Sequence, residues 1–208
     1  MLINYKEVIE LLGKTPKGAI HVGGHYAEEA QDYKDNGITK SIWVEADPNC
    51  IDLLENNLEK VGFEDYRIMN SCVSDKDGEK VIFNLANNEG QSSSFLQLEH
   101  HKTAHPEVQY VDFYEFETET LNTLLKEVED IKDYTFLNAD IQGAELLMLK
   151  GATDIIPNLE CIYLEVNNKE LYKGCPMIED LDDFLKPYGF ERVKTEWCGN
   201  FGWGDAVY

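Results

Sequence analysis

Three short segments of this chain carry residue types that could bind a ligand and act on it chemically. His21–Gly24 ends an apolar run in paired glycines, which let a backbone turn sharply and come close to a ligand. Glu45 and Asp140 each lie at the end of another apolar run. Carboxylates can accept hydrogen bonds from hydroxyl groups or remove a proton from one. Because ligands of open α/β sheets bind beyond the carboxyl ends of the strands, we expect the three segments to meet in one site.

The spacing between the glycines and Glu45 predicts a nucleoside ligand. Glu45 follows Gly24 by about 20 positions, where an acid accepts hydrogen bonds from ribose hydroxyls. A dinucleotide and S-adenosylmethionine compete as cofactors, and a solvent-facing Glu45 is the alternative to both. A pyrophosphate needs more glycine than Gly23-Gly24 supplies, whereas S-adenosylmethionine carries net positive charge and suits an acidic site. We therefore favour S-adenosylmethionine, with a dinucleotide-dependent oxidoreductase or a non-catalytic binding module as alternatives.

The segment Asp140–Glu145 begins with the residue that we expect to act on the acceptor. If a hydroxyl group is methylated, a base must take its proton, and Asp140 is our candidate for that base or for positioning the acceptor. Glu165 and Asn167, at the end of the next expected strand, are placed to assist. Asp140 could also cap the helix that follows. A divalent cation bound to these oxygen ligands is a further alternative.

Serines and histidines between the expected strands add polar groups to this region. Ser92 and Ser93 belong to a run of three serines whose hydroxyl groups could reach the cofactor or a polar acceptor; a solvated loop is the alternative. His101 and His105 would share a helix face, where zinc could use both, but no third ligand is evident from the spacing. If this segment folds over the site, His105 is a candidate base.

Composition limits the partners of the protein. The 208 residues include 40 acidic and 18 basic ones, for a formal net charge of −22. Such a surface repels phosphate groups, so we expect neither nucleic acid nor an anionic membrane as a partner. The five cysteines show no paired metal-ligand spacing, and the N-terminus does not resemble a signal peptide. We therefore expect a cytoplasmic protein.

Apolar runs alternate with helix-like segments in a way that predicts an α/β protein. Because no helix fits between the last two runs, the sheet should close with a C-terminal antiparallel hairpin. The pattern predicts one domain (1–208) on a doubly wound, mostly parallel, seven-stranded, Rossmann-like sheet. An N-terminal helix at about 4–13 and a long irregular insertion at about 84–120 complete it. Strands of the sheet are expected at 19–22, 40–45, 66–73, 133–141, 159–166, 190–197 and 205–208, an exposed strand at 80–85, and the main helices at 26–36, 48–62, 121–128, 144–156 and 177–185.

The motifs together resemble the FkbM family of S-adenosylmethionine-dependent methyltransferases. The resemblance is carried by His21–His25, Trp43–Pro48, Gly90–Ser94, Asp140–Leu146, Leu164–Val166 and Gly204–Tyr208. It implies a class I methyltransferase fold and O-methylation of a hydroxyl on a sugar, glycan or small molecule, and it implies no metal. Gly24 stands where many members have alanine, and Ala27 where a third glycine is common. The residues that we expect to contact S-adenosylmethionine are His21, Val22, Gly23, Gly24, Glu45, Ala46, Ser92, Ser93, Asp140 and Gln142.

Overall fold

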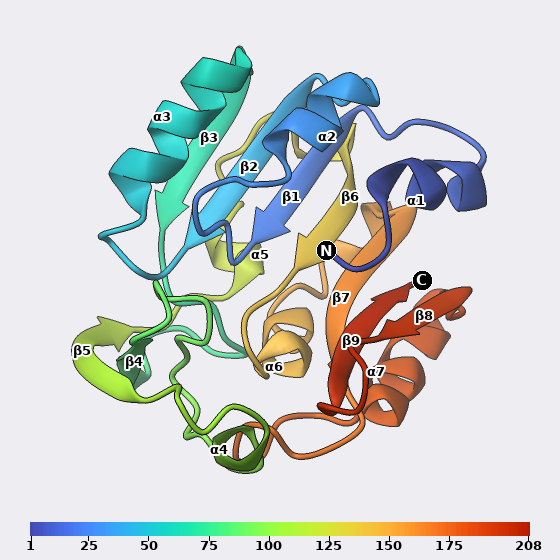
Figure 1. Ribbon diagram of the computed structural model, residues 1–208. Coiled ribbons are helices and arrows are strands. Elements are labelled where there is room, and N and C mark those ends of the chain that lie inside the picture. Colours follow the sequence, from blue (N-terminus) through green and yellow to red (C-terminus); the bar gives the residue numbers. More distant parts are fainter.

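A computed structural model describes residues 1–208 and shows a single twisted sheet of seven strands in the order β3-β2-β1-β6-β7-β9-β8 (Figure 1). The first five run parallel, and β9 runs antiparallel to both of its neighbours. The predicted doubly wound sheet with a closing antiparallel hairpin is confirmed. Its strands are β1 (Gly18–Val22), β2 (Lys40–Glu45), β3 (Asp65–Asn70), β6 (Tyr134–Ala139), β7 (Cys161–Asn167), β8 (Lys194–Trp197) and β9 (Trp203–Val207).

Helices cover both faces of the sheet, because its central strands are apolar on both sides. Residues that alternate along β1 illustrate this, since Ala19 packs in one hydrophobic cluster and Ile20 in the other. One cluster lies under α1, α2 and α3, and the other under α5, α6 and α7. No helix has the length and apolar character needed to cross a membrane. The helices are α1 (Tyr5–Leu12), α2 (Ala30–Asp35), α3 (Ile51–Val61), α5 (Leu121–Leu124), α6 (Glu145–Lys150) and α7 (Ile178–Leu185).

Two helices begin later than the sequence pattern predicts. The helix expected from residue 26 begins at Ala30, because His25 and Ala27 have φ values of 40° and 56° and turn the chain first. The helix expected from Pro48 begins at Ile51, after a turn. The free N–H groups of α2 therefore do not lie directly above the glycines. The predicted ends of α1 and α3 are confirmed, since Gly13 and Gly62 cap them in the left-handed conformation.

The prediction that the insertion is irregular is wrong for much of its length. β5 (Tyr110–Glu117) pairs antiparallel with β4 (Lys80–Ala86) in a separate two-stranded sheet, and α4 (His101–Ala104) lies between them in the chain. Aromatic and β-branched residues, which suit strands, make up five of the eight residues of β5, but acidic residues between them obscure the apolar pattern. The insertion folds across the carboxyl ends of the central strands, which is where the candidate site lies (Figure 1).

Candidate active site

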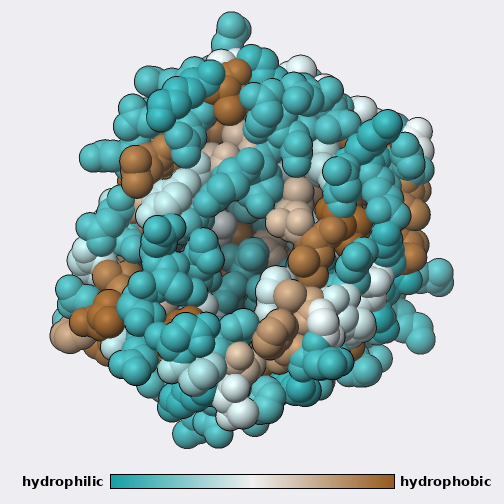
Figure 2. All heavy atoms as spheres, viewed as in Figure 1, coloured by the Kyte–Doolittle hydropathy of each residue, from teal (hydrophilic) through white to brown (hydrophobic).

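A cavity of about 670 Å³ lies beyond the carboxyl ends of β1, β2, β6 and β7, and residues of the insertion cover it. It opens at the hollow in the centre of Figure 2, where most of the surrounding surface is hydrophilic. The structure brings together nearly all of the predicted site residues. Those that line the cavity are His21, Val22, Gly23, Glu45, Ala46, Ser92, Ser93, His105, Asp140, Gln142 and Glu165.

The two glycines after β1 have structural roles that differ from the predicted one. Gly23 has a φ of +84°, and a Cβ atom there would lie 1.9 Å from the Asp140 carbonyl oxygen. Gly24 does not line the cavity; a Cβ atom there would meet Leu54 and Trp43. Both backbone N–H groups donate to the Val44 carbonyl oxygen. The glycines therefore pack the end of β1 against its neighbours instead of presenting free N–H groups.

His21 belongs to the sheet beneath the cavity. Its ring stacks on Trp43 with centroids 4.5 Å apart, and its Nδ1 lies 3.0 Å from the Tyr33 hydroxyl. The side chain is only 3% exposed, and burial lowers its pKa. His21 is therefore neutral and forms part of an aromatic floor, from which it can contact a bound ligand.

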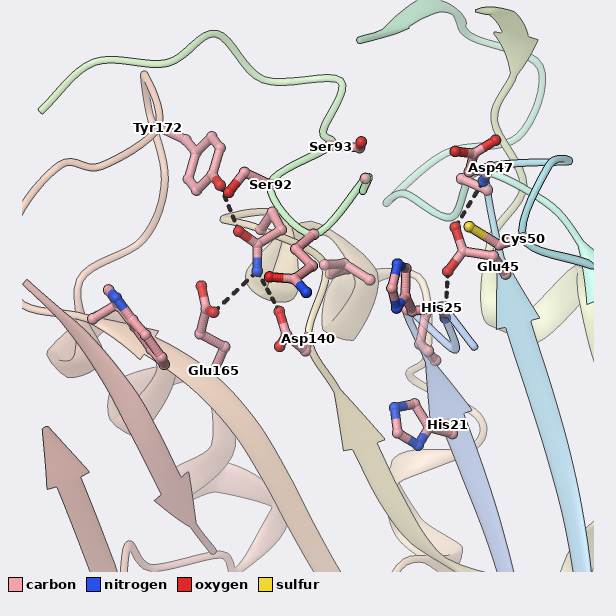
Figure 3. Close-up of a pocket in the computed structure, with 18 of the residues that line it drawn as sticks. His21, His25, Glu45, Asp47, Cys50, Ser92, Ser93, Asp140, Glu165 and Tyr172 are labelled. Carbon is pink, nitrogen blue, oxygen red and sulfur yellow. Dashed lines mark hydrogen bonds between the residues drawn. The ribbon is translucent and has the colours of Figure 1, made fainter. Parts of the chain in front are cut away.

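Glu45 lies in the cavity wall at the end of β2 and is fixed there by two backbone donors. One carboxylate oxygen accepts from His25 N–H at 2.8 Å and the other from Asp47 N–H at 2.7 Å (Figure 3). Burial raises the pKa of Glu45, and the two hydrogen bonds oppose this shift. Each carboxylate oxygen keeps a further lone pair for a ligand hydroxyl.

His25 joins the turn after β1 to the insertion. Its Nδ1 lies 2.7 Å from a carboxylate oxygen of Glu28, and its Nε2 lies 2.9 Å from the Glu89 carbonyl oxygen. Burial by itself would lower the pKa of His25, but these two hydrogen bonds raise it to about 9. At neutral pH the protonated ring therefore donates both bonds and holds the insertion over the Glu45 end of the cavity.

Asp140 and Glu165 are joined by the amide of Gln142, which follows β6. The Gln142 amide nitrogen donates to Asp140 at 2.5 Å and to Glu165 at 3.0 Å, and the Tyr172 hydroxyl donates to the amide oxygen (Figure 3). Asp140 is exposed to the cavity that it lines. The protein that surrounds this cavity, and to a smaller extent the Asp205 carboxylate, raises the pKa of Asp140 to about 6. Burial and then Asp140 raise the pKa of Glu165.

Sequence reasoning missed Glu145, which holds the loop that carries Asp140. Glu145 is fully buried, and one of its oxygens accepts from the N–H groups of Ile141 at 3.0 Å and Gly143 at 3.2 Å. Burial raises its pKa to about 7. In the sequence, the signal for this role is the position of Glu145 in the first turn of α6. The alternative role of Asp140 as a helix cap is wrong, because α6 begins at Glu145 after an Ala144 N-cap.

The serines of the insertion mainly fix the loop that carries them. Ser93 accepts from Ala86 N–H at 3.0 Å, and Ser94 donates to the Gln142 carbonyl oxygen at 3.0 Å. Ser92 accepts from Asn88 at 3.0 Å and lies 3.2 Å from His101 Nε2. Ser92 and Ser93 line the cavity and can reach a ligand only in addition to these bonds.

His101 and His105 lie together at the insertion side of the cavity, with ring centroids 5.1 Å apart. His101 is buried, and burial, followed by the His105 ring, lowers its pKa to about 4. The His105 ring stacks on Phe201 at 4.9 Å and makes no hydrogen bond to Asp140 or Glu165. No three His, Cys, Asp or Glu side chains converge as metal ligands.

The charges that line the cavity are mainly negative. Eight lining residues are acidic and none is lysine or arginine, although the protonated His25 ring and the Met1 amino group are positive. Asp205, one of the eight, accepts hydrogen bonds from Leu2 N–H and from the Tyr163 hydroxyl, which leaves Asp140 and Glu165 as the less engaged pair beside it. Low dielectric and mainly acidic walls favour a neutral or positively charged ligand. This donor set fits a cofactor with net positive charge and a ribose.

Comparisons with known proteins agree with this geometry. Residues 21–192 match the family model described as the methyltransferase FkbM domain. The chain is 21% identical to 2-O-methyltransferase NoeI of Sinorhizobium fredii over 191 residues, which cover 88% of this chain and 77% of NoeI.

Solved structures share the fold at low sequence identity. The METTL16 methyltransferase domain matches with a TM-score of 0.58 and 13% identity, over 98% of this chain and 65% of that one, just under two thirds. A putative tRNA (m1A22) methyltransferase of Streptococcus pneumoniae, solved with S-adenosyl-L-methionine, matches with a TM-score of 0.52 and 15% identity, over 97% of this chain and 70% of that one. The family and the fold imply S-adenosylmethionine as the cofactor. This chain belongs to the FkbM methyltransferase family.

Proposed function

We propose that this methyltransferase transfers a methyl group from S-adenosylmethionine to a hydroxyl group of a sugar or other small molecule, with Asp140 as the general base. The observation that carries the proposal is the position of Asp140, which faces the cavity beside Glu165 and is oriented by Gln142. A nearby fixed carboxylate is what a hydroxyl acceptor needs, because its proton must leave as the methyl group arrives.

The cofactor would occupy the side of the cavity formed by β1 and β2. Glu45 would accept hydrogen bonds from the ribose hydroxyls, and the turn around His25 would close over them. When bound, S-adenosylmethionine supplies an electrophilic methyl group on a positively charged sulfur. The acidic lining stabilises that charge, and the insertion excludes water from it.

Asp140 has a pKa suited to a base that works at neutral pH. A carboxyl with a pKa of about 6 is mostly ionised at pH 7, yet it is more basic than an ordinary aspartate. Asp140 would orient the acceptor hydroxyl and take its proton. Glu165, whose pKa is raised further, would hold a proton and limit repulsion between the two carboxyl groups. His105 remains a second candidate base from the insertion.

The charge of the cavity supports a neutral acceptor. Eight acidic residues and no lysine or arginine line it, which opposes a phosphate group and hence a nucleic acid. NoeI is named as a 2-O-methyltransferase, and this name supports a hydroxyl group as the acceptor. The putative tRNA methyltransferase among the solved structures shares the fold only, at 15% identity.

A two-step experiment tests the proposal. S-adenosylhomocysteine should raise the melting temperature of the protein, and NAD should not. A panel of free sugars, glycosides and phenols, each with a phosphorylated counterpart, is then incubated with S-adenosylmethionine carrying a labelled methyl group. We expect label on oxygen of neutral acceptors only. Label on nitrogen, or on phosphorylated compounds in preference, would overturn the acceptor class; no response to S-adenosylhomocysteine would overturn the cofactor.

A further inference from the structure

Tyr172 connects three parts of the site without being one of the predicted site residues. It lies after β7, is fully buried, and donates its hydroxyl hydrogen to the Gln142 amide oxygen (Figure 3). It also forms a backbone bridge with Leu98 of the insertion. The Tyr172 side chain is therefore fixed at its base by the insertion and at its tip by the loop that follows β6.

The backbone around Gln142 makes a tight turn that packs against Tyr172. Gln142 has a φ of 55°, and Gly143 has a φ of +95° and packs on Tyr172, where a Cβ atom would lie 3.1 Å from Tyr172 Cβ and Cδ2. The nitrogen and oxygen ends of a glutamine amide have nearly the same shape, so packing alone does not distinguish its two orientations. Hydrogen bonds must select one of them.

The two orientations differ strongly in electrostatic energy. In the observed one, the amide NH₂ donates to both Asp140 and Glu165. In the flipped one, the amide oxygen would face these two carboxyl groups. Burial raises the pKa of Tyr172 well above its ordinary value, so its hydroxyl stays protonated and can donate to the amide oxygen. With the hydroxyl as the donor, the bond exists only in the observed orientation; in the flipped one the hydroxyl oxygen could only accept from the amide NH₂ group.

We propose that Tyr172 is a positioning residue: its hydroxyl fixes the Gln142 amide so that the NH₂ group faces Asp140 and Glu165. The inference rests on the proposed function only for the role of Asp140 as the base. The geometry itself, with one donor and one acceptor at opposite ends of a single amide, is independent of the identity of the acceptor.

The consequence of this positioning is a lower pKa for Asp140 than its surroundings would give. Enclosure and neighbouring acids raise it, and the hydrogen bond from Gln142 opposes them. Loss of the Tyr172 hydroxyl would leave the amide oxygen without its donor and the amide less firmly held, so the opposing bond would weaken. The charged and titratable groups that face Asp140 are Asp205 on β9, Glu165 on β7, Glu145 on α6, Glu29 before α2 and the amino group of Met1.

The test is a pH titration of the Asp140 carboxyl carbon by NMR in protein labelled with ¹³C at aspartate. The signal is assigned by its absence in Asp140→Asn. Tyr172→Phe keeps the ring and removes only the hydroxyl, and we expect it to raise the pKa of Asp140 by about half a unit or more. Tyr110→Phe is the matched control, because the Tyr110 hydroxyl donates to the Leu96 carbonyl oxygen at 2.7 Å and the residue does not line the cavity. It should leave Asp140 unchanged.

A second variant covers the case in which Tyr172→Phe does not fold. Gln142→Asn keeps the amide but is one methylene too short to reach Tyr172 and both acids, so it should raise the pKa of Asp140 in the same direction. An unchanged titration of Asp140 in the folded variants would overturn the proposal. Because no methyl transfer is measured, this result is distinct from a failure of the acceptor screen.

Discussion

Gly23 and the Asp140 carbonyl group are in such close contact that a Cβ atom at residue 23 would lie 1.9 Å from the carbonyl oxygen. β1 and β6 are neighbours in the sheet, and this contact fixes the turn after β1 against the loop that carries the proposed base. The proposed cofactor and acceptor sides of the cavity are therefore joined by packing at their base. A change at residue 23 should disturb both sides at once.

Gly23→Ala should lower the free energy of unfolding by about 3 kcal/mol or more. The added methyl group overlaps a backbone atom that cannot move easily, and an alanine at a φ of +84° is itself strained. Urea denaturation measures the effect. Gly24→Ala is the matched control: its Cβ would meet side chains and no backbone atom, the end of Leu54 at 3.0 Å and the Trp43 ring at 3.3 Å, so a cost of about 1 kcal/mol is expected. Equal effects at both positions would contradict this explanation.

The central strands of the sheet could be predicted because each contains an apolar run that is buried on both faces, as in Lys40–Glu45. The start of α2 could not, because two residues other than glycine adopt positive φ in the turn before it. That conformation depends on tertiary contacts such as the hydrogen bond from His25 N–H to Glu45. Ala27, with a φ of 56°, occupies a conformation that glycine adopts without strain.

The candidate site could be predicted as a set of strand ends but not as a network. Glu45 and Asp140 lie where the βαβ pattern places them, because parallel strands end at the same edge of a sheet. The partners of Gln142 are Glu165 and Tyr172, which are distant in sequence. Spacing alone cannot reveal such long-range contacts, and it cannot reveal that a buried Glu145 holds the same loop.

Glu45→Ala should weaken S-adenosylhomocysteine binding by about 10- to 100-fold, because a hydrogen bond to a charged group contributes about 1.5–3 kcal/mol. It should also lower the melting temperature, since His25 N–H and Asp47 N–H lose their acceptor. Isothermal titration calorimetry measures the affinity. Glu55→Ala, an exposed acid on α3, should change neither property. Unchanged affinity in folded Glu45→Ala would place the ribose elsewhere.

His25 should make stability depend on pH between about 6.5 and 9. Its folded-state pKa of about 9 lies above the value of about 6.5 in an unfolded chain. Protonated His25 therefore stabilises the fold fully below about pH 6.5, and this contribution is lost as the pH rises through 9. The difference in unfolding free energy between wild type and His25→Gln should be largest at pH 6 and smallest near pH 9.5. A difference that does not change with pH would mean that folding does not shift the pKa of His25.

Asp140→Asn should remove activity and yet stabilise the protein above pH 6. The folded-state pKa of about 6 lies above the ~3.9 of an unfolded aspartate, so folding favours the protonated form. That contribution is present below about pH 4 and is lost as the pH rises through 6, where the charged carboxylate faces Asp205 and Glu165. Asparagine is neutral at every pH, so the variant should exceed wild type in unfolding free energy at pH 8 and approach it at pH 4.

Methyl transfer by Asp140→Asn should fall by about 10²- to 10⁴-fold, the usual contribution of a general base. Asp52→Asn, an exposed acid on α3, is the control for both measurements. If Asp140→Asn were less stable than wild type at pH 8, the Asp140 carboxylate would have to be stabilised by its surroundings, and its pKa would be too low for the proposed base.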